Sequence, residues 1–314
     1  MNKHVFIIGE VGSNYNGRLE VAQKCIHAIR TSGADAVKFQ TIRKDKLVAP
    51  KVLLNGAWTD NPVYQNFRNL ELPDDWHYVL KATADRCGIE FISTPFYREA
   101  VDLLEKVGVS TFKIASGDIT FFPLLEAIGH TGKSVILSTG ASSLQDVERA
   151  LKILMKSGAG QIMLLHCISN YPPLWEEMNI RAIVTLRETF GLPVGISDHS
   201  PGSIIPIAAV ALGATVVEKH VTFDRSLPGP DHPFAMTMEE LREMVQQIRL
   251  LEKALGTGEK VPSETELAKQ YRIRRGQYDP ESLLPGNKSD SIWLRPSYDT
   301  PMPDRQVRQR GEGN

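Results

Sequence analysis

The chain has 314 residues, a length that suits two average domains or one large α/β barrel. Hydrophobic residues make up 42% and charged residues 23%, which is a globular composition and excludes disorder throughout. Lys and Arg number 36 against 37 Asp and Glu, so the formal net charge of -1 gives no footprint for nucleic acid or an anionic membrane. The three widely spaced cysteines form neither a disulfide framework nor a zinc ribbon, which favours a reducing cytoplasm.

Eight short apolar runs alternate with amphipathic stretches. Continuous apolar runs are typical of parallel strands that are buried on both faces. Glycines after most of the amphipathic stretches indicate helix ends. The predicted strands are 5–9, 36–40, 90–94, 111–116, 134–139, 162–167, 193–197 and 215–220. The predicted helices are 19–32, 73–87, 98–107, 123–131, 143–157, 179–190, 201–212 and 238–255.

This alternation predicts a (β/α)8 TIM barrel over residues 1–258. A doubly wound open sheet would alternate in the same way, but no glycine-rich nucleotide-binding motif follows a strand. The longest uncharged stretch, 200–217, is broken by Gly202, Pro206 and Gly213, so we expect no membrane span, and the N-terminus shows no targeting segment.

Two segments do not fit the alternation. The loop between Gln40 and Pro73 is long enough for a lid or binding loop, although a surface excursion without function is the alternative. Its candidate contact residues are Trp58, Asn61, Tyr64 and Asn66. Residues 259–314 are rich in proline and poor in apolar residues near their end, so we expect an irregular, extended C-terminal tail.

Polar residues follow all eight predicted strands, at the end of a barrel where active sites form. A polar ligand explains this ring better than packing does, because buried polar groups without partners are costly. His199 and His220 end neighbouring strands, and two imidazoles suit Mn, Zn or Fe with open positions for water and substrate. Two histidines that hydrogen-bond a substrate, or each other, remain an alternative.

Lys38 and Lys113 lie within predicted strands, where lysine is rarely buried unless it is paired. With hydroxyls from Ser116, Ser138 and Ser197 they predict a cationic pocket for a phosphate and a carboxylate. Ion pairs of the lysines with Glu10 or Asp118, or a Schiff-base lysine, are the alternatives. Glu10 could act as a general acid or base, or hold sugar hydroxyls.

Nine motifs in order resemble those of the sialic acid synthase family. They are EVGSNYNG (10–17), AVKFQT (36–41), FISTPF (91–96), FKIASGD (112–118), ILSTG (136–140), LHCISNYP (165–172), GISDH (195–199), VEKH (217–220) and LPGPDH (227–232). The resemblance implies condensation of phosphoenolpyruvate with an open-chain, N-acylated amino sugar, giving a nonulosonic acid and phosphate by C–O bond cleavage. It also implies a divalent cofactor, Mn²⁺ before Mg²⁺ or Co²⁺, and a homodimer.

By this resemblance His199 and His220 are metal ligands, and Glu10, Lys38 and Lys113 are catalytic. The implied phosphoenolpyruvate contacts are Lys38, Lys113, Ser116, Ser138 and Ser197, with either Ser169 or Asn170, and the implied sugar contacts are Glu10, Gln40, Tyr171 and Asp231. Asp118 stands where relatives have Asp or Glu, and we expect it to bind substrate. Family members usually carry a C-terminal antifreeze-like domain, and we interpret residues 259–314 as a linker and a remnant of it. A Schiff-base sugar aldolase and a non-catalytic sugar-phosphate-binding barrel stay open.

Overall fold

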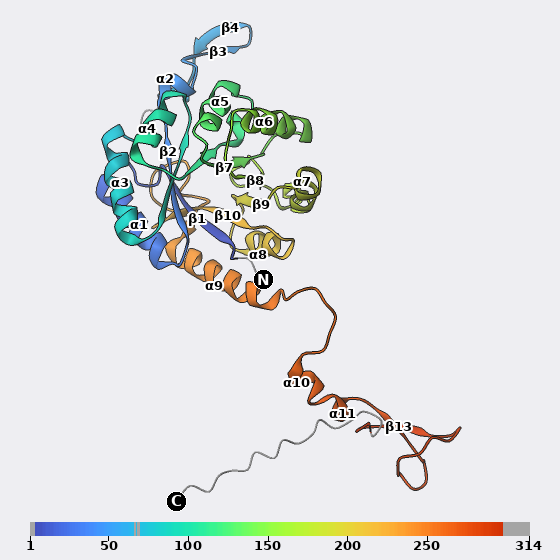
Figure 1. Cartoon of the computed structure of the whole chain (residues 1–314). Helices are drawn as coiled ribbons and strands as arrows, with labels where there is room; N and C mark the ends of the chain where they lie inside the picture. The colour runs from blue at the N-terminus through green and yellow to red at the C-terminus, as the bar shows by residue number, and fades with distance from the viewer. Residues whose placement is uncertain (1–3, 66, 68–69, 298–314) are drawn as a thin grey trace, which may run out of the picture. The chain divides into compact units, whose positions relative to one another are not determined.

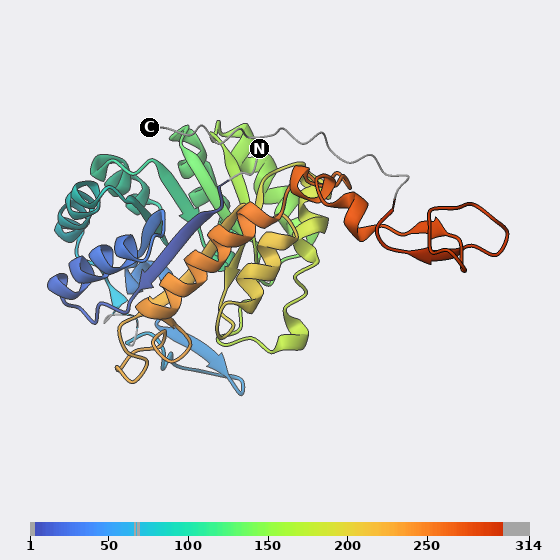
Figure 2. The same ribbon diagram turned by 90° about the horizontal axis from the view of Figure 1, so that it is seen from below.

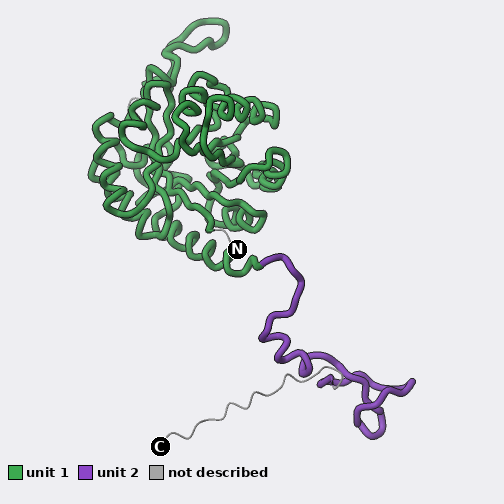
Figure 3. Tube along the Cα trace, in the orientation of Figure 1, with its two compact units in different colours: residues 1–256 green, residues 257–314 purple. Residues whose placement is uncertain are grey.

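The computed structural model describes residues 4–65, 67 and 70–297. The chain divides into two compact units, residues 1–256 and 257–314, which are coloured separately in Figure 3. The sequence analysis placed this boundary after residue 258.

Parallel strands of the first unit form a closed barrel, which confirms the predicted TIM-barrel fold (Figure 1). The strands follow one another in chain order around the barrel, and the first pairs with the last. They are β1 (Phe6–Gly12), β2 (Ala36–Thr41), β5 (Glu90–Pro95), β6 (Thr111–Ile114), β7 (Ser134–Ser138), β8 (Ile162–Cys167), β9 (Val194–Asp198) and β10 (Val216–Thr222). The two-residue strand β11 (Met236–Thr237) pairs in parallel with the end of β10.

Helices cover the outside of the barrel at the predicted places. They are α1 (Leu19–Thr31), α3 (Asp74–Cys87), α4 (Glu99–Val107), α5 (Phe122–His130), α6 (Leu144–Lys156), α7 (Ala182–Phe190), α8 (Ile204–Ala211) and α9 (Met238–Ala254). Figure 2 shows α9 between α1 and α8, beside the first strand. Gly88 and Gly108 end their helices with positive φ angles of 65° and 85°, as the sequence predicts.

Several predicted boundaries differ from the structure by two or three residues, such as the end of the first strand at Gly12 instead of residue 9, and three of the differences have local causes. The predicted strand 111–116 ends at Ile114, because Ser116–Asp118 turn into a single 3-10 turn over the barrel mouth. The helix predicted from 179 begins at Ala182, since Asn179 has a positive φ of 37°. The helix predicted from 201 begins at Ile204, after the positive φ of Gly202.

The long loop after β2 builds structure of its own. It contains α2 (Lys44–Leu47) and a hairpin of β3 (Lys51–Leu54) and β4 (Ala57–Asp60), which projects from the barrel in Figure 1. Trp58 lies on this hairpin and is 70% exposed, and the Asn61 side chain donates to the carbonyl oxygen of Ala49. Asn66 lies outside the described residues.

The second unit is more ordered than the expected irregular tail. It contains α10 (Glu264–Leu267), α11 (Gln270–Ile273) and an antiparallel pair, β12 (Gly276–Tyr278) and β13 (Ile292–Leu294). The pair forms because the apolar run 292–294 supplies a second strand for residues 276–278. Residues 298–314 of the predicted tail lie outside the described residues. Within the described chain no helix has the length and apolar character to cross a bilayer.

Candidate active site

The interior of the barrel changes from apolar to polar over two residues along each strand. Ile8, Ala36, Ile92, Ile136, Leu165 and Val216 form a buried apolar layer across the barrel. Because side chains on one face of a strand recur every second residue, the next inward position is two residues further on. These next positions are Glu10, Lys38, Thr94, Ser138, Cys167 and Glu218. The polar layer therefore stands on an apolar floor, at the carboxyl ends of the strands.

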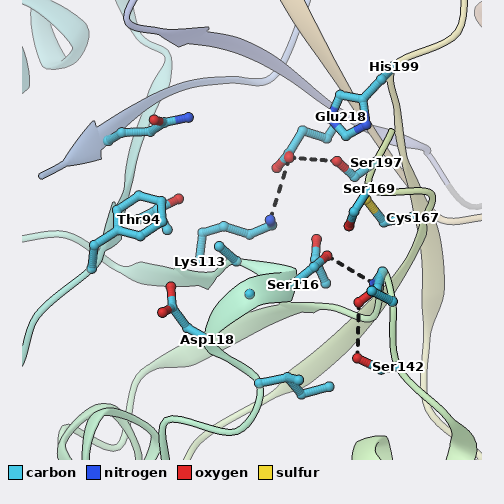
Figure 4. A pocket seen from close by; sticks show the side chains of 18 of the residues that line it. Thr94, Lys113, Ser116, Asp118, Ser142, Cys167, Ser169, Ser197, His199 and Glu218 are labelled. Carbon is cyan, nitrogen blue, oxygen red and sulfur yellow. Dashed lines mark hydrogen bonds and ion pairs between the residues drawn. The ribbon is translucent and has the colours of Figure 1, made fainter. Parts of the chain in front are cut away.

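A cavity of about 730 Å³ opens above this layer (Figure 4). The barrel brings together at its walls all but two of the predicted site residues, namely Glu10, Lys38, Gln40, Lys113, Ser116, Asp118, Ser138, Ser169, Tyr171, Ser197, His199 and His220. Asp231 lines an adjoining cavity that shares Gln40, Tyr171 and His220 with the first. The Asn170 side chain instead donates to Glu177 at 2.9 Å, so of the pair 169–170 it is Ser169 that faces the cavity.

Both lysines of the cavity form ion pairs with buried carboxylates. Lys38 Nζ lies 2.9 Å from Glu10 and 3.7 Å from Glu218. Lys113 Nζ lies 3.5 Å from Glu218, whose other close partner is the Ser197 hydroxyl at 2.9 Å (Figure 4). The alternative of internal ion pairs is therefore present for Lys38 with Glu10, whereas Lys113 pairs with Glu218 rather than with Asp118.

The expectation of a cationic pocket is therefore wrong as stated, since two carboxylates balance the two ammonium groups. Burial lowers the pKa of Lys113, and the carboxylate of Glu218 opposes this effect only in part. Burial also acts to lower the pKa of Lys38, but Glu10 and Glu218 together leave it raised. The two lysines thus differ in how firmly they hold their protons.

Hydroxyl groups crowd the wall formed by the ends of β6, β7 and β8. The Gly140 N–H donates to Ser116 Oγ at 2.9 Å. A Cβ on Gly140 would lie only 2.3 Å from Ser169 Oγ and 2.8 Å from Ser116 Oγ, so only glycine lets the two hydroxyls approach the backbone this closely. Ser138 Oγ is buried and has no hydrogen-bond partner among the described residues. A buried orphan hydroxyl beside two others indicates a site for a polar ligand.

Asp118 lies at the rim of this wall with one buried, unpartnered carboxylate oxygen. Burial raises its pKa to about 6, an effect that the charge of Lys113 reduces. Cys167 lines the cavity too, but burial raises the pKa of its thiol, which does not suit a nucleophile.

His199 and His220 face each other across the ends of β9 and β10, with ring centroids 5.2 Å apart. The carbonyl oxygen of Ile168 lies 3.2 Å from Nδ1 of His199 and can only accept, so Nδ1 carries the proton and Nε2 carries the free lone pair. Burial, together with the nearby His220, lowers the pKa of His199 to about 3, so the ring is neutral. Nδ1 of His220 is buried without a hydrogen bond, 3.5 Å from an Asp231 carboxylate oxygen.

This donor set fits a divalent cation held by the two imidazoles. Among the described residues, no group of three or more His, Cys, Asp or Glu side chains is arranged to hold a metal. A site with two protein ligands leaves positions for water and substrate, as catalytic metal sites do and closed structural sites do not.

Glu218 lines the cavity and is a candidate site residue that the sequence analysis did not select. The signal was available: on a strand, Glu218 must share the face of His220, two residues away. By the same rule Asp198 and Lys219 face outward, where Lys219 Nζ lies 2.8 Å from Asp198. His166 also faces away from the barrel interior, and its ring bonds the carbonyl oxygen of Met178 at 2.8 Å.

Comparisons with known proteins identify the family of the chain. The NeuB family matches residues 25–260. The chain is 43% identical over 303 residues to N,N'-diacetyllegionaminic acid synthase of Legionella pneumophila, covering 93% of this chain and 85% of that protein. It is 34% identical over 257 residues to human N-acetylneuraminate-9-phosphate synthase, covering 80% and 71%.

A solved structure has the same barrel. The N-acetylneuraminic acid synthetase of Leptospira borgpetersenii superposes with a TM-score of 0.78 at 36% identity, covering 84% of this chain and 90% of that one. The family match spans most of the chain, and the identities hold over most of each relative's length. The chain therefore belongs to the NeuB family of sialic acid synthases, and it is an enzyme of the transferase type.

Proposed function

We propose that this enzyme condenses phosphoenolpyruvate with an N-acylated amino sugar related to N-acetylmannosamine, giving a nonulosonic acid and phosphate with the help of a divalent cation. The observation that carries the proposal is the single cavity that joins a hydroxyl-and-lysine wall to the pair His199 and His220. The names of the relatives agree with this choice of reaction.

The hydroxyl wall suits phosphoenolpyruvate. Lys113, Ser116, Ser138 and Ser197 supply one cation and three hydroxyls, and the Ser138 hydroxyl needs a partner. Glu218 lies within ion-pair distance of both Lys38 and Lys113. When a phosphate or carboxylate of the substrate binds one of the two ammonium groups, the other therefore keeps Glu218 as its partner, and no buried cation is left unpaired.

The opposite wall suits the sugar. Glu10 accepts a hydrogen bond from Gln40 at 2.8 Å, and Tyr171 and Asp231 stand beside His220. Carboxylate, amide and phenol groups in this arrangement can hold the hydroxyls of an open-chain sugar with its aldehyde toward the two imidazoles. Holding both reactants in line is a large part of the rate, since orientation can supply roughly 7–11 kcal/mol.

His199 and His220 would hold the cation. When bound, the cation supplies Lewis acidity that makes the aldehyde carbon more electrophilic. Imidazole ligands favour Mn²⁺ over Mg²⁺, and Co²⁺ should also support activity.

The reaction balances without an oxidant. The C3 carbon of phosphoenolpyruvate forms a bond with the aldehyde carbon, water adds to C2, and the bond between C2 and the bridging oxygen breaks to release phosphate. The aldehyde oxygen gains one proton and the attacking water loses one, and Glu10, held between Lys38 and Gln40, is placed to pass this proton from the water to the sugar oxygen. The proton of the new C2 hydroxyl leaves with the phosphate as C2 becomes a ketone. The C3 attack leaves positive charge at C2, which the carboxylates of Glu10 and Glu218 stabilise.

Phosphate release tests the proposal. With Mn²⁺, phosphoenolpyruvate labelled with ¹⁸O in its bridging oxygen and N-acetylmannosamine should give labelled phosphate, and omission of either substrate should stop release. His199→Ala should lower turnover by more than about 100-fold with an unchanged circular dichroism spectrum, because loss of a metal ligand should exceed the roughly 10–100-fold cost of outer-shell changes. Full activity of this variant, or label retained in the keto acid, would contradict the proposal.

The same assay separates the alternatives. A Schiff-base aldolase would be trapped covalently by borohydride in the presence of pyruvate, and its activity would not change when a chelator is added. A non-catalytic barrel would release no phosphate with any sugar. We also propose a cytoplasmic homodimer, which light scattering and cell fractionation can test.

A further inference from the structure

A lysine and an aspartate are buried together on the outer face of the barrel wall, behind the two imidazoles. Lys219 is 2% exposed and Asp198 is 1% exposed, and their Cα atoms are register partners across β10 and β9. Such side chains are almost never fully buried unless they are paired, and here Lys219 Nζ donates to Asp198 Oδ2 at 2.8 Å. Neither residue lines the catalytic cavity, so the proposed reaction gives this ion pair no role.

The alternation of side chains along the strands places the ion pair directly between residues of the site. Neighbouring residues of a strand point to opposite faces, so Lys219 faces outward between the cavity residues Glu218 and His220. Asp198 faces outward in the same way, and His199, the next residue, lines the cavity again. A movement of the outer pair would therefore shift the backbone that carries both imidazoles.

The ion pair also holds the residue that follows His199. Asp198 accepts hydrogen bonds from the backbone N–H and from the hydroxyl of Ser200, both at 3.0 Å. Lys219 Nζ donates to the carbonyl oxygen of Ser200 in addition to Asp198. Ser200 is thus bound at its N–H, hydroxyl and carbonyl groups, and it is 1% exposed. The backbone on both sides of His199 is in this way attached to β10, the strand that carries His220.

The hydrogen bond of the His199 ring serves a different purpose. The carbonyl oxygen of Ile168 lies 3.2 Å from Nδ1 and orients the ring, but Ile168 follows β8 and does not connect the two imidazoles. The outer ion pair does connect them, since it joins the ends of β9 and β10, across which the ring centroids lie 5.2 Å apart.

We infer that Lys219, Asp198 and Ser200 are positioning residues for the pair of imidazoles. They hold His199 at the separation from His220 that a single divalent cation requires, and they touch neither the cation nor a substrate. This inference rests on the proposed function, in which the two imidazoles hold the cation, and it adds the residues that arrange them.

Stability by itself is a weak reason for such a pair. Well-packed apolar residues in place of a buried ion pair are often neutral or stabilising. A buried ion pair whose partners also bind one backbone segment specifies a particular arrangement of that segment, because its groups lose much when they are left unsatisfied. A cation with only two protein ligands needs such an arrangement, since no third side chain brings the imidazoles together.

Binding of Mn²⁺ to the metal-free protein, followed by electron paramagnetic resonance, tests the inference without turnover. The double variant Asp198→Asn/Lys219→Met removes both charges, so it leaves no buried ion without a partner. We expect its Kd for Mn²⁺ to rise about 10- to 100-fold, as is typical when outer-shell partners of metal ligands are lost. Its Kd for phosphoenolpyruvate in the absence of metal, measured by calorimetry, should stay unchanged, whereas a general loosening of the barrel would weaken both.

Two single variants complete the test. Ser200→Ala removes only a hydroxyl and should fold even if the double variant does not, and we expect it to raise the Kd for Mn²⁺ about 3-fold. Thr41→Val is the matched control, because Thr41 is also 1% exposed at the end of a barrel strand, and its hydroxyl lies 2.8 Å from the ring of His77 on α3. Its Kd for Mn²⁺ should equal that of the wild type.

The outcomes separate this inference from the proposed function. Wild-type affinity for Mn²⁺ in the double variant or in Ser200→Ala overturns the inference and leaves the proposed function standing. An equal loss of affinity for Mn²⁺ and for phosphoenolpyruvate, or an equal loss in Thr41→Val, does the same. A wild-type protein that binds no Mn²⁺ overturns both the inference and the proposed metal site.

Discussion

The buried carboxylate of Glu218 contacts side chains from three other strands of the barrel. It lies within ion-pair distance of both Lys38 and Lys113 and accepts a hydrogen bond from Ser197, so it connects β2, β6, β9 and β10. Burial by itself would raise its pKa, but Lys113 and Lys38 leave the pKa well below the usual value, and the residue is ionised. The cavity can therefore hold two ammonium groups without a large excess of buried positive charge.

Asp118 should make the stability of the barrel depend on pH. Its pKa is raised to about 6 in the native state against 3.8 in the unfolded chain, so the folded protein holds this proton more tightly. The stabilising contribution is complete below about pH 3.8 and is lost as pH rises through 6. We expect Asp118→Asn to remove this loss of folding free energy. The loss amounts to roughly 3 kcal/mol, because each unit of pKa shift corresponds to about 1.36 kcal/mol.

Urea unfolding at pH 4, 5, 6 and 7 provides the measurement. The free energy of unfolding of Asp118→Asn minus that of the wild type should grow with pH over this range, and the subtraction cancels the titration of the other groups. A difference that is constant with pH would show that Asp118 has an ordinary pKa.

At the scale of elements, a cluster of charges fastens α9 to the start of β1. Arg249 donates to the carbonyl oxygen of Val5 at 2.9 Å, and pairs with Asp35 at 2.9 Å and Glu252 at 2.7 Å. The two carboxylates in turn accept the backbone N–H groups of Ile7 and Val5. This cluster joins the last helix of the barrel to the strand at which the barrel closes.

Arg249→Ala should lower the free energy of unfolding by about 2 kcal/mol, because it removes charge-assisted hydrogen bonds and leaves partly buried carboxylates without a cation. Arg242→Ala, at an exposed position of the same helix, is the control and should change stability by less than about 0.5 kcal/mol. Equal effects of the two changes in a urea titration would mean that the cluster does not hold α9 in place.

The elements that the sequence predicts well are those in which local pattern and tertiary environment agree. The apolar run Ile162–Cys167 is buried along its strand, and its observed bounds equal the predicted ones. The turn at Ser116 was missed because no glycine or proline separates Thr111–Ile114 from Ala115 and Ser116, so the local sequence does not show where the strand ends. The partner of Lys113 was missed for a similar reason. Lys113 meets Glu218 because β10 lies across the barrel from β6, and the spacing of residues along the chain does not predict which strands face each other.

At the scale of the whole molecule, the two units differ in what they bury. The main hydrophobic core runs from Val5 to Ile248, with Leu251 packed against it, and the described residues that line the cavity at the barrel mouth lie between Glu10 and His220. In the described part of the second unit, Leu284 is 64% and Trp293 is 54% exposed, and the residues buried there are Gly276 and Ser297. Residues 257–297, the described part of the second unit, therefore lack the apolar core that a domain needs.

A chain that ends at Gly256 should consequently fold without the second unit. Its melting temperature should lie within about 3 °C of that of the full chain, since a change below about 1 kcal/mol shifts a domain of this size by roughly 2–4 °C. The separate peptide 257–314 should show no cooperative transition, and the emission of Trp293, its single tryptophan, should stay at the wavelength of a solvated indole. Loss of the cooperative transition in the shortened chain would instead mean that the barrel needs the second unit for its stability.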